Sequence, residues 1–210
     1  GGFVLDATPR TFDLLADIND LSWASFFTGD AMDIGGVLHA NVRGSARADG
    51  SWTTEGTVTG REIRVVRIDD GVRLLDGELS ARLEGDRFIL ESLRFPARLR
   101  VTPDEWRTAE WVSTNPDAKD GSLTVSGSWT LSESVGEVDI DLYRYPILQR
   151  SDRYAMVTGK LRVDAPLPLF SLSGELTADA GWIDLDMLSS VPTVDSDVVV
   201  VRSGVKPKAS

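Results

Sequence analysis

Alternation of apolar and polar residues is the dominant pattern along this chain. Residues 77–95 read GELSARLEGDRFILESLRF, in which Leu79, Ala81 and Leu83 alternate with polar residues before an EGD turn at 84–86. An apolar-rich segment then resumes at Phe88. Period-two alternation predicts strands, and a short glycine-containing turn between two of them predicts a β-hairpin.

The same pattern covers nearly the whole chain and predicts an almost entirely β protein. The apolar positions shift parity after Gly60, which predicts a β-bulge near residues 60–62. Glycine-containing turn signals separate the predicted strands. They lie at residues 49–50, 70–71, 76–77, 84–86, 135–136 and 180–181.

A loose internal repeat accompanies the alternation. Gly-x-apolar triplets begin at Gly36, Gly77, Gly121 and Gly159, and we interpret each as the start of a strand. Repetition of this kind favours an elongated sheet that grows in one direction over a closed Greek key. Because no break in composition divides the chain, we treat residues 1–210 as one segment of a longer β-structure.

One helix is predicted with a recognisable start. Thr102, Pro103 and Glu105 form a capping box with proline at the first helical position, so we expect a short helix near residues 103–111. Residues 115–121 are expected to be a loop, and a second helical turn is possible at residues 22–27.

A sheet with one apolar face needs something to cover that face. Two sheets can pack as a sandwich, one sheet can close into a barrel, or it can curl into an open trough with an apolar floor. Charges such as Arg162, Glu175 and Asp184 on the other face, without aromatic girdles, disfavour a membrane barrel. The pattern itself leaves the sandwich or solenoid and the trough open.

Composition narrows the functional classes. The net charge of -11 argues against nucleic acid and against docking on anionic lipid headgroups. The absence of cysteine excludes disulfides and thiolate chemistry and suits an oxidising compartment. No apolar run is long enough to span a bilayer, and no signal peptide is visible. Because the chain begins at Gly1-Gly2 within the pattern and ends at residues 205–208 with VKPK followed by two residues, we expect a piece of a longer protein.

Residues able to perform chemistry are sparse. His39, the single histidine, lies on the polar parity and has no second histidine for a triad or a metal cluster. The pairs Asp139/Asp141 and Asp184/Asp186 occupy same-face strand positions about 7 Å apart, and we interpret them as solvated charges. The sequence therefore predicts no catalytic residue, no metal and no cofactor, which favours a non-enzymatic protein.

The C-terminal third carries a resemblance to a known family. Residues 172–176 read LSGEL, residues 183–188 alternate with aspartate, Pro192 lies in a loop, and DSD at 195–197 leads into four valines. DLSW at 20–23 and DRFILESL at 86–93 add to it. In these features the chain resembles the TamB family, within the wider AsmA-like group.

The resemblance implies a fold, a location and partners. Such proteins have a long antiparallel sheet curled into an open hydrophobic groove, a β-taco. They are anchored in the inner membrane, which here requires a segment absent from this sequence, and they span the periplasm. Their partner is the insertase-type outer-membrane barrel TamA. They are implicated in assembling outer-membrane proteins and in moving phospholipid, and this chain corresponds to a region near the C-terminus.

The resemblance also implies which residues line the groove, namely the apolar positions of the predicted strands. They are Leu38, Ala40, Val42, Trp52, Val58, Ile63, Val65, Leu79, Leu83, Leu99, Val101, Leu123, Val125, Trp129, Val138, Ile140, Leu142, Val157, Leu161, Val163, Leu172, Leu176, Ile183 and Leu185. The expected function is a conduit or chaperone for phospholipid acyl chains or nascent outer-membrane protein strands. The alternative is a closed β-sandwich or solenoid, a structural or adhesin-like module without cargo. Strand addition at an exposed sheet edge is compatible with the first.

Overall fold

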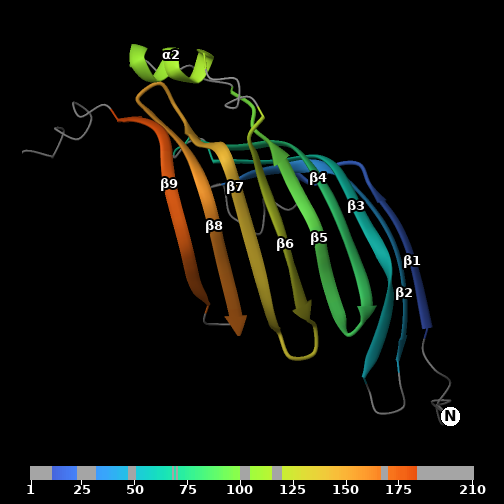
Figure 1. Ribbon diagram of the computed structural model, residues 1–210. Helices are drawn as coiled ribbons and strands as arrows, with labels where there is room; N and C mark the ends of the chain where they lie inside the picture. The colour runs from blue at the N-terminus through green and yellow to red at the C-terminus, as the bar shows by residue number, and fades with distance from the viewer. Residues whose placement is uncertain are drawn as a thin grey trace, which may run out of the picture.

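The chain forms one nine-stranded antiparallel sheet in which each strand pairs with the next in sequence (Figure 1). The computed structural model describes residues 11–22, 32–46, 51–67, 69, 71–99, 105–114, 120–166 and 170–183. The strands are β1 (Thr11–Ile18), β2 (Asp33–Ala46), β3 (Trp52–Arg67), β4 (Val72–Gly85), β5 (Arg87–Pro96), β6 (Ser122–Thr130), β7 (Val135–Gln149), β8 (Arg153–Pro166) and β9 (Ser171–Ile183). The helix α2 (Trp106–Thr114) lies between β5 and β6.

The strand order confirms the predicted architecture. The sheet runs from β1 to β9 without a crossover and is curled but not closed, so β1 and β9 remain its two edges. The described part of the chain contains this one sheet rather than two, so it does not form the sandwich that the pattern left open. The chain is mainly β with one short helix, as expected.

The predicted hairpin at residues 77–95 and the bulge near residue 60 are confirmed. Gly85, with φ of 65°, and Asp86 connect β4 to β5. The register of β3 against β4 shifts between Gly60 and Ile63, and Glu62 has a φ of 55°. A bulge of this kind bends its strand and increases the local twist.

Some strands continue beyond the level of the β3 bulge, and irregularities in their backbone or pairing bend them there. Asp76 in β4 and Arg144 in β7 have positive φ, and the β8–β9 register shifts between Met156 and Val157. At this level β5 has ended, and β6 has not yet begun. Past the bends β4 and β7 therefore meet directly, and the Gln149 N–H donates to the Gly71 carbonyl at 3.0 Å.

The sheet consequently tapers. We call the end with the β4–β5 and β6–β7 turns the wide end, at the bottom of Figure 1. The opposite end, where β4 meets β7 and α2 lies, is the narrow end. All nine strands contribute to the wide part, whereas β5 and β6 are missing from the narrow end.

The predicted strand starts were wrong for most of the Gly-x-apolar triplets. Gly121 directly precedes a strand, but Gly36, Gly77 and Gly159 lie inside β2, β4 and β8. At Gly77 a Cβ atom would collide with the Phe95 ring, so close packing between strands explains this glycine. The turns predicted at residues 76–77 and 180–181 were also wrong, because β4 and β9 continue through them.

The helix α2 begins later than predicted and ends later. Its first residue follows Glu105, whose carboxylate accepts a hydrogen bond from the Thr108 N–H at 2.7 Å. This bond lowers the pKa of Glu105 and caps the helix. Of the expected capping box, Thr102 and Pro103 lie outside the described residues, as do residues 23–27 of the possible helical turn and residues 115–119 of the expected loop.

The helix covers the outer face of the sheet at the narrow end. Trp111 and Leu99 pack against Tyr154 and Met156, which are 1% and 0% exposed. Met156 and Val157 are neighbours in β8 and so point to opposite faces. Because Val157 packs into a separate core on the other face, α2 does not lie over that face.

Candidate functional site

The face opposite α2, which we call the inner face, carries apolar rows that cross the whole sheet. Directly paired residues on neighbouring strands point to the same face, so the register defines rows that cross the strands. One unbroken row joins Ile18, Leu38, Gly60, Leu79, Leu93, Val125, Ile140, Leu161 and Gly174. The next row toward the wide end joins Ala16, Ala40, Val58, Ala81, Leu90, Gly127, Val138, Val163 and Leu172. Neither row contains a polar side chain.

The structure brings most of the residues expected to line a groove onto this face. A third row holds Val42, Leu83 and Trp129, with Leu14, Gly56, Phe88 and Gly136. Toward the narrow end, Leu123, Leu142 and Leu176 follow one another in a row with Phe95 and Gly159. Ile63 and Val157 pack into the same region, and Val65 pairs with Leu74 at the bent end of β3 and β4.

A few expected residues lie elsewhere. Leu99 follows β5, outside any strand, and packs under α2 on the outer face, because the chain leaves the sheet after Pro96. Ile183, the last residue of the edge strand β9, pairs with Arg153 and so keeps the inner-face parity of Val157, but at the end of the strand it is 60% exposed. Val101, Leu185 and the side chain of Trp52 lie outside the described residues.

Several inner-face residues were missed at the sequence level. Phe88 and Leu90 precede a register shift in β5, and Leu93 and Phe95 follow it, so the apolar parity changes inside the strand. The irregular spacing of apolar residues in FILESLRF was the available signal for this bulge. Tyr145 was missed for the same reason, because it follows the positive-φ residue Arg144.

The narrow end of the inner face is filled by the protein itself. We call the buried side chains there the cap cluster; they are Ile63, Phe95, Ala97, Leu123, Leu142 and Tyr145. Phe95 and Tyr145 are each 1% exposed. Burial without charge compensation raises the pKa of Tyr145 far above its usual range.

The wide end and the edges of the inner face are uncovered in the part of the chain that the structure describes. Phe12 and Leu14 on β1 are 40% and 49% exposed, and Leu172 and Leu176 on β9 are 60% and 48% exposed. The inner residues between the edges are mostly only partly buried, although they lie in the centre of a sheet. The result is an apolar face of the curled sheet that is filled at one end and accessible at the other.

The outer face is charged, and its charges form pairs. Arg162 on β8 contacts Glu137, Asp139 and Asp164, and Lys160 binds Asp141 at 2.8 Å. These carboxylates raise the pKa of Arg162 and of Lys160. Asp139 and Asp141 thus have cationic partners, and within the described residues no three acidic or histidine side chains gather into a metal site. Asp184 and Asp186 lie outside those residues.

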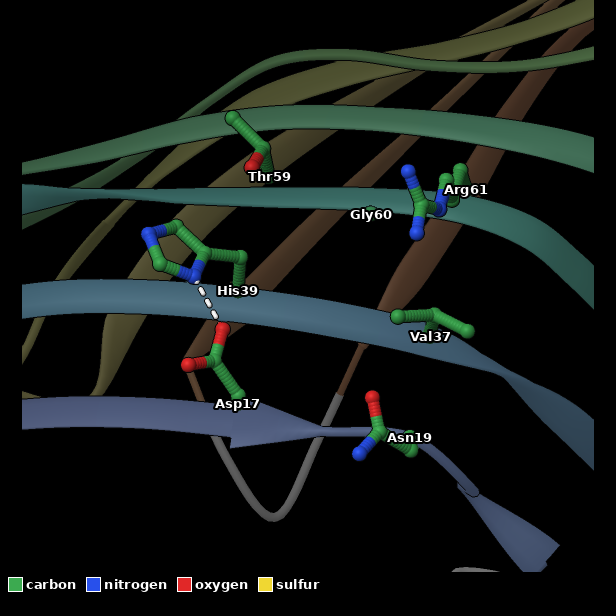
Figure 2. A pocket seen from close by; sticks show the side chains of 7 residues that line it. All are labelled: Asp17, Asn19, Val37, His39, Thr59, Gly60 and Arg61. Atoms are coloured by element: carbon green, nitrogen blue, oxygen red, sulfur yellow. Dashed lines mark hydrogen bonds and ion pairs between the residues drawn. The ribbon is translucent and has the colours of Figure 1, made fainter.

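His39 also lies on the outer face, as its parity predicted. It contacts Asp17 on the neighbouring strand β1 through Nδ1, and Thr59 is its partner on β3 (Figure 2). These three residues line a pocket of about 410 Å³ with Asn19, Val37, Gly60 and Arg61. The pocket is shared by β1, β2 and β3 and is mostly polar, so it differs from the inner face in both location and chemistry.

The apolar rows are suited to contact with hydrocarbon. The described side chains of the central rows offer only apolar contacts, and each buried CH₂ group contributes about 0.8 kcal/mol. No helix among the described residues has the length and apolarity needed to cross a membrane. No family model, curated protein or solved structure matches the chain.

Proposed function

We propose that this chain is part of a non-enzymatic conduit or chaperone of the TamB type. Its inner face is the groove, and its cargo is phospholipid acyl chains or nascent outer-membrane protein strands. The observation that supports this proposal is the unbroken apolar rows that cross all nine strands and are left uncovered at the wide end of the described sheet. A large exposed apolar surface of this kind marks an interaction site in a soluble protein.

The chemistry of the groove favours passage over tight capture. The two central rows present no charged or polar side chain that would hold one headgroup in place. Affinity then grows only with the length of hydrocarbon buried, at about 0.8 kcal/mol per CH₂. The ion pairs of the outer face keep the curled sheet hydrated on the side away from the cargo.

The setting of the proposal comes from the sequence resemblance. In it the chain works in the periplasm, within a longer protein anchored in the inner membrane, and delivers cargo toward the outer membrane. The partner is the insertase-type outer-membrane barrel TamA, reached through the longer chain. No cofactor and no nucleic acid take part.

Two adjacent leucines provide the test. Leu14 and Leu15 are neighbours on β1 and point to opposite faces, Leu14 to the inner face beside Val42. Leu15 is the more exposed, at 68% against 49%. A photo-crosslinking amino acid is placed at position 14 or 15 of the full-length protein in cells, and the adducts are identified by mass spectrometry.

If cargo occupies the groove, adducts should form at position 14 and few should form at position 15. If labelling followed only the exposure of the side chain, position 15 would be labelled more. Adducts with the mass of a phospholipid identify lipid cargo, and adducts with outer-membrane proteins identify strand cargo. Equal labelling at both positions, or no adduct at either, would contradict the proposed function. Leu14→Arg and Leu15→Arg variants provide the matched functional pair, and only the first should impair outer-membrane assembly.

A further inference from the structure

The narrow end of the groove is held shut by a contact between two hairpin tips. We call it the hairpin clasp, and it comprises Asp69 and Gly71 from the β3–β4 side and Gln149, Arg150 and Arg153 from the β7–β8 side. The Gln149 N–H donates to the Gly71 carbonyl at 3.0 Å. Arg150 and Arg153 donate to the Asp69 carbonyl at 3.0 and 3.4 Å.

The clasp differs from every other junction in the sheet. Strands that are neighbours in the sheet are joined by ladders. β4 pairs with β3 as far as the narrow end but with β5 only over Glu78–Glu84, and β7 pairs with β8 to that end but with β6 only over Val135–Tyr143. β4 and β7 therefore meet at their tips without forming a ladder of their own. Separating the tips leaves the nine-stranded ladder intact, so this junction can open without unfolding the sheet.

The residues of the clasp are positioned for this contact. The stem of Arg150 occupies the space that a side chain at position 71 would need, so glycine there permits the close approach. Asp152 accepts a hydrogen bond from Arg150 Nε at 2.7 Å and lies 3.6 Å from Arg153 Nε. The carboxylate thus holds both arginines toward the opposite hairpin, and Arg150 lowers the pKa of Asp152.

The cap cluster lies at the same end of the inner face. Ile63 and Leu74 reach it from the β3–β4 hairpin, and Tyr145 and Ile147 from the β7 side of the clasp. Moving the tips apart would expose these apolar side chains to water, which is unfavourable unless something apolar replaces the lost contacts. A hydrocarbon chain can replace those contacts. A ligand that binds the open form more tightly than the closed form shifts the population toward the open form.

We propose that the hairpin clasp is a gate. Its closed form seals the narrow end of the groove, and its two tips separate when an acyl chain enters among the side chains of the cap cluster. The proposal rests on the proposed function, because it names the step by which the same groove admits lipid to its buried part. The wide end remains the entrance, and the gate decides how far a chain can advance.

The test uses the absence of cysteine in this chain. Asp69 and Ser151 are exposed residues at the two tips, and both are replaced by cysteine in one variant. A short bis-maleimide then links the tips, and a mono-maleimide on the same variant serves as the control. The probe is a vesicle of phosphatidylethanolamine and phosphatidylglycerol carrying a trace of pyrene-labelled phospholipid, and transfer of the label to the protein is followed by fluorescence.

A gate predicts that the linked protein takes up labelled lipid at least about tenfold more slowly than the mono-labelled control. Arg150→Ala, which removes one charged hydrogen bond and its packing on Gly71, should accelerate uptake by about tenfold. Arg162→Ala, which removes an arginine from the outer face, should leave uptake unchanged. Spin labels at positions 69 and 151 should move apart when lipid is bound.

The outcomes separate the gate from the groove. Equal uptake by linked and unlinked protein, with an unchanged distance between the spin labels, would overturn the gate while leaving the groove in place. Failure of the mono-labelled protein to take up any lipid would overturn both. The linking test does not use Arg150→Ala, so its result does not depend on whether that variant remains folded.

Discussion

Phe95 provides the sharpest test of the cap cluster. Its side chain is 1% exposed and lies at the end of β5, where the ring occupies the space left by the missing side chain of Gly77. Truncating a buried phenylalanine to alanine costs about 3–5 kcal/mol. The upper half of that range is expected for Phe95→Ala, about 4 kcal/mol, because Gly77 has no side chain that can move into the cavity.

Urea unfolding followed by tryptophan fluorescence measures this loss. With a slope of about 2 kcal/mol per molar urea, the midpoint should fall by about 2 M. Phe12→Ala is the matched control, because Phe12 lies on the same face at the edge strand β1 but is 40% exposed. Its loss should stay near 1 kcal/mol or below, since burial of a whole phenylalanine contributes only about 1.5–3 kcal/mol.

A second substitution distinguishes specific packing from general hydrophobicity. Gly77→Ala places a methyl group against the Phe95 ring and should cost about 1–3 kcal/mol in the wild-type background. In the Phe95→Ala background the ring is absent, so the same change should be neutral or stabilising. Additive losses in the two backgrounds, or a Phe95→Ala loss below about 1 kcal/mol, would refute the packing described for the narrow end.

Three further predictions concern polar groups. Tyr154 is 1% exposed, and its hydroxyl has no hydrogen-bond partner within the described structure. Tyr154→Phe should therefore raise the free energy of unfolding by about 1 kcal/mol in the same urea assay. A loss of stability would reveal a partner for the hydroxyl. The pKa of Asp152 is lowered from 3.8 by its hydrogen bond from Arg150, so its stabilisation is present above that pH and is lost as the pH falls through the lowered value. Asp152→Asn should therefore flatten the decline of the urea midpoint below about pH 4, and an unchanged decline would exclude this carboxylate as a contributor. Arg162→Ala should change the thermal midpoint little and not at all in high salt, because its ion pairs are exposed and screened, and a large salt-independent loss would contradict this account.

The regular strands could be predicted because every second residue on them lies on the apolar face, so the alternation in the sequence is uninterrupted. Leu123, Val125 and Trp129 on β6 and Val138, Ile140 and Leu142 on β7 alternate without interruption. The pairing of most neighbouring strands followed from the short turns between them, since a short turn joins antiparallel neighbours. The pairs β1–β2 and β5–β6 are instead joined by the longer segments 19–32 and 97–121.

The failures occur where the local pattern is interrupted by a longer-range requirement. Within β5 a bulge changes the parity between Leu90 and Leu93, which a strict alternation rule does not follow. The Ala180-Gly181 pair looked like a turn, yet Ala180 packs against the Tyr154 and Met156 cluster beneath α2, where a small residue fits. Tertiary packing overrode the turn preference of this pair.

The narrow end had no signature in the sequence. Gly71 and Gln149 are far apart along the chain, and nothing near either residue indicates that their hairpins meet. Their contact depends on the ends of β5 and β6, which stop short and leave a gap between β4 and β7. The residues of the candidate groove could thus be predicted, but how far the groove extends could not. Its filled end arises because β5 and β6 are shorter than β4 and β7.

The meeting of β4 and β7 has a consequence for how such a protein can be lengthened or shortened. β4 runs toward the wide end and β7 runs away from it, so the two strands are already antiparallel. Excising β5, α2 and β6 would leave partners of compatible direction, joined by one new turn, and the sheet would lose two strand widths, about 10 Å. Whole hairpins are therefore natural units of insertion and deletion here, and the span of the sheet can change in steps without redesign of the strands on either side.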